Sequence, residues 1–183
     1  MIFFELPLAG AFLIELQPFQ DERGLFARTF CQKEFSRIGF DKQIVQINHS
    51  VTRQKGTIRG MHYQHPPASE IKIIRCIQGE AFDVIVDIRE GSSTFMKWHG
   101  VKLAKNNMRM VYIPKGFAHG FQSLTDNCEL IYLHSEFYSP DHEHGFRYDD
   151  PAVSISWPCS LLQISQRDTS HPFLQNDFRG IEL

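Results

Sequence analysis

The sequence of residues 56–64 is Gly56-Thr57-Ile58-Arg59-Gly60-Met61-His62-Tyr63-Gln64. It joins a cation, a titratable imidazole and an amide on one short segment, a combination suited to chemistry on an anionic substrate. If residues from Ile58 onward form a strand, alternation places His62 and Arg59 on opposite faces, and His62 and His65 diverge in the same way. Arg59 lies near the start of that strand, from which its planar fork can reach round the rim to a phosphate. The structural alternative is a buried, hydrogen-bonded His62 and a solvated Arg59, and this segment alone favours it.

Short apolar and alternating runs surround this segment, separated by turn-forming residues. Their recurrence at roughly eight to twelve residues is typical of a β-sandwich or β-barrel. The predicted strands are residues 11–17, 43–50, 58 onward, 70–77, 81–88, 94–103, 108–113, 116–124, 129–138 and 154–157. The expected remainder is a turn-rich loop at 18–24, extended chain at 25–30, a helix at 33–38 closed by Gly39, a covering loop at 139–151 and a tail at 160–183 with a short helix. We infer one all-β domain over residues 1–183, an antiparallel double-sheet jelly roll whose interior can hold a ligand.

Composition and charge narrow the class of protein. The chain has 183 residues and a formal charge of −2, and this lack of a basic field argues against a nucleic-acid partner. CxxC spacing is absent among the four cysteines, which favours a reducing cytoplasm. Residues 1–12 contain Glu5 and Pro7 and lack a continuous apolar stretch, so we expect neither a signal peptide nor a membrane span.

Five side chains are candidates for catalysis, and most fall on predicted strands: His62, Lys72, His119, Tyr132 and Asp168. Such a set suits proton removal and return next to a carbonyl. An imidazole can act as the base, an aspartate can orient it, a phenol can return a proton and a cation can stabilise the enolate oxygen. A core histidine, a buried tyrosine and a snorkelling lysine are the structural alternative, and these residues alone leave both open.

Residues 113–120, Ile-Pro-Lys-Gly-Phe-Ala-His-Gly, resemble the second motif of cupins. Metal-binding cupins also supply His-x-His and a following Glu, because two histidines two apart on a strand chelate easily. Here His62 and His65 are three apart, position 64 is Gln, and only Glu70 could replace the carboxylate. We therefore predict a metal-free cupin-like cavity. The rival is a metal-dependent cupin isomerase or oxygenase that uses His62, His65, Glu70 and His119.

Further motifs occur in a fixed order along nearly the whole chain. They are Asp21-Glu22-Arg23-Gly24, Gln46-x-Asn48-x-Ser50, Arg59 to Gln64, Lys72, Asp83 to Arg89, Gly91-Ser92, Pro114 to Phe121, Tyr132, Glu136 to Tyr138, Asp150-Pro151, Trp157-Pro158 and Ser165 to Asp168. In this order they resemble the dTDP-4-dehydrorhamnose 3,5-epimerase family of nucleotide-sugar enzymes.

The resemblance implies a homodimer that epimerises a 4-keto-6-deoxy sugar on a nucleoside diphosphate, without metal or organic cofactor. The simplest case converts dTDP-4-dehydro-6-deoxy-D-glucose to dTDP-4-dehydro-L-rhamnose, for surface polysaccharide. By this match His62 is the base, Asp168 its partner and Tyr132 the acid, while Lys72, with His119, stabilises the enolate. The alternatives are another nucleotide sugar, inversion at one carbon only, and a non-catalytic sugar-nucleotide binding module.

The same match assigns the substrate-binding residues. Arg23 and Arg59 correspond to diphosphate contacts, and part of the nucleotide site comes from the partner chain. The pocket lining corresponds to Phe19, Gln46, Asn48 and Tyr138. The chain departs from the family at Arg28, where Glu is common, and at Arg167, where Lys is common. Both departures lie near the expected nucleotide site, so they leave the substrate's identity open while the reaction type stands.

Overall fold

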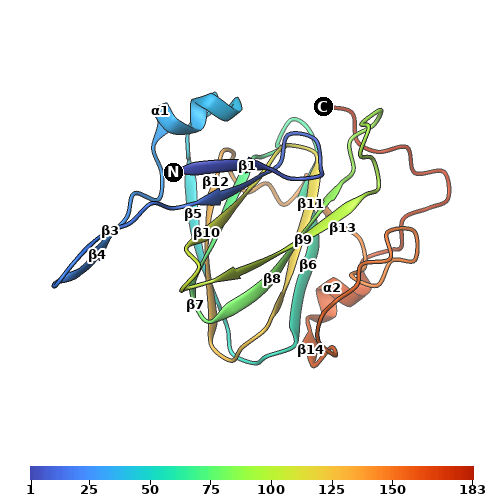
Figure 1. The fold of residues 1–183 in the computed structure, drawn as a ribbon. Coiled ribbons are helices and arrows are strands. Elements are labelled where there is room, and N and C mark those ends of the chain that lie inside the picture. The colour runs from blue at the N-terminus through green and yellow to red at the C-terminus, as the bar shows by residue number, and fades with distance from the viewer.

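Two antiparallel β-sheets pack face to face, and the computed structural model describes all 183 residues (Figure 1). One sheet has the strand order β1 (Ile2–Glu5), β2 (Phe12–Glu15), β10 (Arg109–Ile113), β7 (Lys72–Gln78), β12 (Cys128–His134) and β5 (Gln46–Thr52). The other has the order β13 (Glu143–Gly145), β6 (Thr57–Gln64), β11 (Phe117–Ser123), β8 (Glu80–Asp87) and β9 (Trp98–Ala104), with β14 (Gln163–Ile164) parallel to β6. The predicted all-β, cupin-like jelly roll is confirmed.

Alternate side chains of the two sheets form the core between them. Ile74 and Leu130 of the first sheet join Ile85 and Phe121 of the second in one buried cluster. Fully burying one such side chain contributes about 1.5–3 kcal/mol, so this cluster holds the sheets together. On the outer face of the first sheet, Phe35 at the end of α1 (Gln32–Phe35) is buried in a second cluster.

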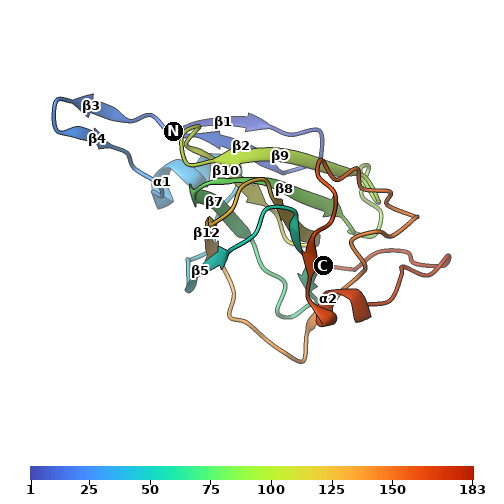
Figure 2. The same cartoon turned by 90° about the horizontal axis from the view of Figure 1, so that it is seen from below.

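Beyond β2 the chain leaves the sandwich as a projecting hairpin of β3 (Phe19–Asp21) and β4 (Gly24–Phe26), which Figures 1 and 2 both show extending away from the body. Phe19 is 79% exposed and Phe26 is 71% exposed. The sequence predicted a loop and then extended chain in this region, and the two form one antiparallel arm. Most of the surface of both aromatic side chains is therefore left uncovered by this chain.

Other predicted elements differ in detail from the structure. The predicted helix at 33–38 is confirmed as α1 and the 3₁₀ turn η1 (Ser36–Ile38), ended by Gly39 at φ 84. The predicted tail helix is α2 (Gln166–Ser170). Strand β1 was not predicted, and the predicted covering loop at 139–151 contains the short strand β13. The prediction of a strand at 154–157 is wrong. Ile155 and Trp157 of that segment instead pack against a buried apolar cluster that includes Val84 and Val86 of β8, without forming a strand of the sheet. None of the helices has the length and apolar character needed to cross a membrane.

A β-bulge in β6 decides which of its side chains face the cavity between the sheets. The register relative to β11 shifts between Arg59 and His62, where Gly60 and Met61 oppose the single residue Gly120. A Cβ on Gly60 would lie 2.6 Å from the Cα of Gly120, so the close approach requires glycine. The extra residue reverses the alternation, and Arg59 and His62 line the same cavity. The prediction that they lie on opposite faces is wrong.

Candidate active site

A cavity of about 660 Å³ opens between β5, β6, β7 and β12, with α2 at its edge. This volume is in the range of small-molecule sites. Ten of the predicted site residues line it: His62, Lys72, His119, Tyr132, Asp168, Arg59, Gln46, Asn48, Tyr138 and Arg167. The structure therefore brings together the whole predicted catalytic set and most of the predicted binding set.

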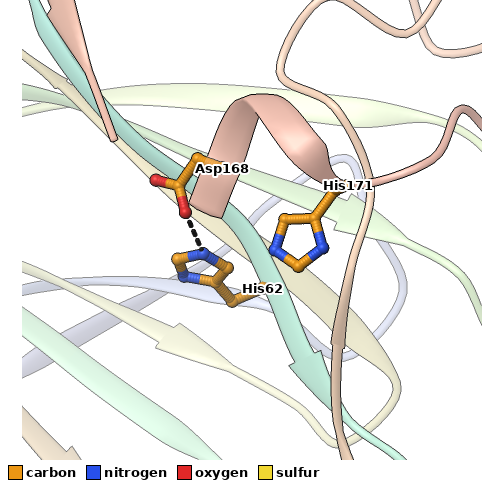
Figure 3. Close-up of side chains that lie close together, drawn as sticks. All are labelled: His62, Asp168 and His171. Carbon is orange, nitrogen blue, oxygen red and sulfur yellow. Dashed lines mark hydrogen bonds and ion pairs between the residues drawn. The ribbon is translucent and has the colours of Figure 1, made fainter. Parts of the chain in front are cut away.

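His62 and Asp168 form the first histidine–carboxylate pair of the cavity (Figure 3). His62 Nε2 donates to Asp168 Oδ1 at 2.8 Å, and the backbone N–H of Gly60 donates to Oδ2 at 3.1 Å. Ser165 caps α2 by accepting from the Asp168 N–H. Burial raises the pKa of Asp168, but the hydrogen bond and charge of His62 outweigh it, so the pKa lies below its ordinary value. Asp168 is thus ionised and orients His62, leaving Nδ1 as the nitrogen that can accept a proton.

Tyr132 lies across the cavity from His62, because β12 and β6 belong to opposite sheets. Its hydroxyl is 3.2 Å from Ser50 Oγ. Burial is the main cause that raises the pKa of Tyr132 well above its ordinary value. The phenol therefore keeps its proton at neutral pH and is available as an acid. The sequence indicated the polar row with Ser50 but not this contact.

His119 and His134, which also line the cavity, form two further histidine–carboxylate pairs. His119 Nε2 donates to Asp83 Oδ2 at 2.8 Å, with both side chains buried. Glu70 accepts from Lys72 Nζ at 3.0 Å and from His134 Nδ1 at 2.6 Å. Burial raises the pKa of Glu70, but Lys72 and His134 together lower it below its ordinary value. Glu70 is thus an ionised anchor for Lys72.

Sequence reasoning missed His134 and considered Glu70 only as a metal ligand. Asn48 Nδ2 is 3.3 Å from His134 Nε2, and the His134 ring stacks against Tyr132 at 6.1 Å between centroids. Since the Asn48 amide donates, His134 Nε2 accepts and Nδ1 carries the proton given to Glu70. The sequence did contain a signal for Glu70, because this carboxylate lies two residues before Lys72, a lysine in an otherwise apolar strand.

Polar side chains with few internal partners form the mouth of the cavity. Arg59 donates to Thr52 Oγ1 and to the Val51 carbonyl, each at 3.2 Å, and has no carboxylate partner. Arg53, which no sequence motif marked, also lines the mouth without a carboxylate partner. Two guanidinium groups free of carboxylates make this end a ready anion site.

A second group at the rim is already internally satisfied. Glu143 accepts a hydrogen bond from the Tyr138 hydroxyl at 2.6 Å and pairs with Arg167. The backbone N–H of Tyr138 donates to Gln46 Oε1 at 3.2 Å. Arg167 is therefore held by a carboxylate, unlike Arg59.

Three predicted binding residues lie outside the cavity of their own chain. Phe19 and Arg23 are on the projecting hairpin, and Arg23 pairs with Asp21 of the same hairpin. Arg28 follows the hairpin and pairs with Glu34 at 2.8 Å. Their expected contacts with a nucleotide therefore need a second chain.

The four residues of the rival metal site, His62, His65, Glu70 and His119, do not bring their ligand atoms together. His65 packs against Tyr63 and His144, Glu70 binds Lys72 and His134, and His119 binds Asp83. The ligand atoms that do cluster belong to His62, Asp168 and His171, within 4.8 Å of one another. His171 was not predicted as a site residue.

Comparison with known proteins gives consistent matches. The model of the dTDP-4-dehydrorhamnose 3,5-epimerase family matches residues 5–176. The dTDP-4-dehydrorhamnose 3,5-epimerase of Shigella flexneri is 43% identical over 168 residues, 91% of this chain and 92% of that protein. A dTDP-6-deoxy-D-glucose-3,5-epimerase from Legionella pneumophila, solved with dTDP-4-keto-L-rhamnose, has TM-score 0.89 and 37% identity over 94% of this chain and 92% of that one. A 3'-monoepimerase from Streptomyces bikiniensis, solved with dTDP-quinovose, has TM-score 0.85 and 34% identity over 92% of this chain and 85% of that one.

Proposed function

This chain belongs to the dTDP-4-dehydrorhamnose 3,5-epimerase family, and we propose that it inverts carbons 3 and 5 of a dTDP-linked 4-keto-6-deoxyhexose. The resemblance inferred from the ordered motifs is confirmed, and the chain is an isomerase of that family. The observation that carries the proposal is the opposition of the His62–Asp168 pair and Tyr132 across one cavity.

The base and the acid act from opposite faces of the sugar. His62 Nδ1 removes the proton on a carbon next to the C4 ketone, and the electron pair moves onto the ketone oxygen as an enolate. Asp168 stabilises the imidazolium that forms. Tyr132 then returns a proton to the same carbon from the other sheet, which inverts its configuration. This role is supported by the raised pKa of Tyr132, whose main cause is burial.

Lys72 stabilises the enolate oxygen, with His119 nearby in the same cavity. A cation at that position favours the transition state because it interacts more strongly with the enolate than with the ketone. Glu70 holds Lys72 in place through the contact at 3.0 Å. No step of this sequence uses a metal or an organic cofactor.

The diphosphate binds at the cavity mouth to Arg59 and Arg53. Gln46 and Asn48 line the same cavity from the start of β5, whereas Arg53 follows the end of that strand. We place the nucleotide partly against a second chain, so that the enzyme is a homodimer whose hairpin closes the partner's cavity. The exposed Phe19 and Phe26 support this arrangement, as does Ile47 on the edge strand β5, which is 64% exposed. A reducing cytoplasm suits the four cysteines, which are all free thiols.

Heavy-water exchange tests the chemistry. Incubating the enzyme with dTDP-4-keto-6-deoxyglucose in D₂O should place deuterium at carbons 3 and 5, as NMR can resolve. His62→Ala should lower the exchange rate about 10²- to 10⁴-fold. Absence of exchange with dTDP-, CDP-, UDP- and GDP-linked 4-keto sugars alike would refute epimerisation and favour a binding module.

Inversion at one carbon is the second candidate, because the Streptomyces bikiniensis relative is a 3'-monoepimerase. The same spectra separate the two, since a monoepimerase would leave carbon 5 in its original configuration. A tenfold higher turnover with another nucleotide corresponds to about 1.4 kcal/mol in transition-state binding. Such a preference would refute the assignment of dTDP as the nucleotide of the substrate, but not the epimerisation. Sedimentation analysis tests the homodimer, and a monomer that turns over at full rate would contradict the shared site.

A further inference from the structure

His171 is a half-buried imidazole that the proposed mechanism does not use. It follows α2 directly, three residues after Asp168, and its Nε2 atom is buried without any hydrogen-bond partner. Native proteins rarely leave such an atom unpaired, and where protein groups offer no partner, an ion or a water molecule commonly supplies the contact. The missing partner of His171 therefore points to a ligand.

The surroundings of His171 hold its ring beside the catalytic pair. Figure 3 shows the imidazole turned toward His62 and Asp168, and the two histidine rings lie 5.7 Å apart at 66°. A Cβ on Gly145 of β13 would lie 2.7 Å from His171 Nε2. The ring thus occupies a space that exists only because residue 145 is glycine, and it is not a free surface side chain.

Two imidazoles and one carboxylate are a common donor set for Zn²⁺, whose bonds to them are about 2.0–2.2 Å. Ligand atoms of a tetrahedral zinc site are then about 3.3 Å apart. Here they lie within 4.8 Å, and the His62–Asp168 contact is 2.8 Å. Closing the site therefore needs side-chain movements of up to about 1.5 Å, within the reach of small χ rotations. Mg²⁺ and Ca²⁺ fit poorly because they prefer all-oxygen sites.

We propose that His62, Asp168 and His171 form a binding site for a divalent transition-metal ion, with Zn²⁺ the best fit, and that the bound ion inhibits the enzyme. The ion takes the place of the proton on His62 Nε2, and that proton leaves to solvent. His62 and Asp168 are then fixed on the ion and no longer form the orienting hydrogen bond. The inhibition rests on the proposed epimerase function, whereas the binding does not.

The test is calorimetric titration of metal-free protein with ZnCl₂ in a non-coordinating buffer. We expect the wild type to bind one ion per chain. His171→Asn should bind Zn²⁺ at least about tenfold more weakly than the wild type, since even the loss of an outer-shell partner lowers metal affinity about 10- to 100-fold. His144→Asn is the matched control, because His144 is an exposed histidine on β13 outside the ligand set. It should bind Zn²⁺ as the wild type does. Equal affinity of all three proteins, or loss only in His144→Asn, would overturn the site.

A measurement on the wild type alone guards against a folding defect in the variant. In protein labelled with ¹⁵N at the histidine rings, Zn²⁺ should shift the resonances of His62 and His171 together at one equivalent. Shifts confined to His65, His142 and His144 would reveal surface binding and refute the proposal. Zn²⁺ binding at the site with unchanged exchange activity would refute the inhibition. These readouts need no substrate for binding, so they remain decisive if the proposed epimerisation fails.

Discussion

Changing Glu70 to Gln tests how the buried charges beneath the substrate are arranged. The carboxylate is 3.0 Å from Lys72 Nζ, and the two side chains are 8% and 12% exposed. At an effective dielectric constant of about 20, unit charges at this distance attract by about 5 kcal/mol. Removing one partner of such a pair costs about 3–5 kcal/mol, and Gln restores part of this through neutral hydrogen bonds worth about 1 kcal/mol each. We expect a loss of about 2–4 kcal/mol in the free energy of unfolding.

Glu129→Gln is the matched control for this change. Glu129 also pairs with a histidine, His49, at 2.9 Å, but these side chains are 30% and 47% exposed. Surface pairs contribute about 0–1 kcal/mol, so urea unfolding should separate the two variants clearly. A Glu70→Gln penalty equal to that of Glu129→Gln would refute the role of Glu70 as a buried anchor.

The pH dependence gives a second measure of the Glu70 pair. The folded-state pKa of Glu70 is lowered, because Lys72 and His134 outweigh the burial that raises it. Its stabilisation is therefore complete above the unfolded-state value of 4.5 and is lost as the pH falls through the lower folded-state value. The stability gap between wild type and Glu70→Gln should narrow in that acidic window. A gap independent of pH down to complete acid unfolding would contradict this.

Three other changes probe the acid, the bulge and a histidine cluster. Tyr132→Phe should lower epimerised product about 10²- to 10⁴-fold while deuterium exchange falls less, as NMR of the same reactions will show; equal losses would contradict its role as the returning acid. Gly120→Ala should destabilise the fold by more than about 1 kcal/mol, because the new Cβ would lie 2.8 Å from the backbone carbonyl oxygen of Arg59, which cannot move aside as a flexible side chain can; thermal unfolding measures this. Burial, with His144 and His142, lowers the pKa of His65 from 6.5, so wild-type stability falls as the pH drops below that value; His65→Asn should show a smaller decrease in melting temperature, and an identical decrease would count against this.

The strands, and the group of residues predicted to be catalytic that lines the cavity, could be found from the sequence because both depend on local pattern. Alternating runs determine strands, and glycine and proline mark their ends, so most strands were found within a few residues. The ordered motifs located His62, Tyr132 and Asp168, and the structure places all three in one cavity.

What the sequence did not reveal depends on pairing between distant residues. The bulge at Gly60 and Met61 follows from register against β11, and it alone brings Arg59 to the side of His62. Glu70 and His134 meet because β7 and β12 are neighbouring strands. Such contacts have no local sequence pattern, since they arise only once the strand order is fixed.

The distribution of charge in the cavity gives the substrate a direction. Glu70, Asp83 and Asp168 each have a partner inside the protein, so the catalytic end presents no unpaired carboxylate to the sugar. At the mouth, Arg59 has no carboxylate partner, and a diphosphate can supply the anionic partner instead. Arg59 and His62 pair with Phe121 and His119, which are two residues apart on β11, so the bulge holds them about 7 Å apart along the strand, a spacing that a hexose ring can bridge between the phosphates and the base. The bulge that brings Arg59 and His62 into one cavity therefore also determines the distance between the diphosphate contact and the base, which the substrate must span.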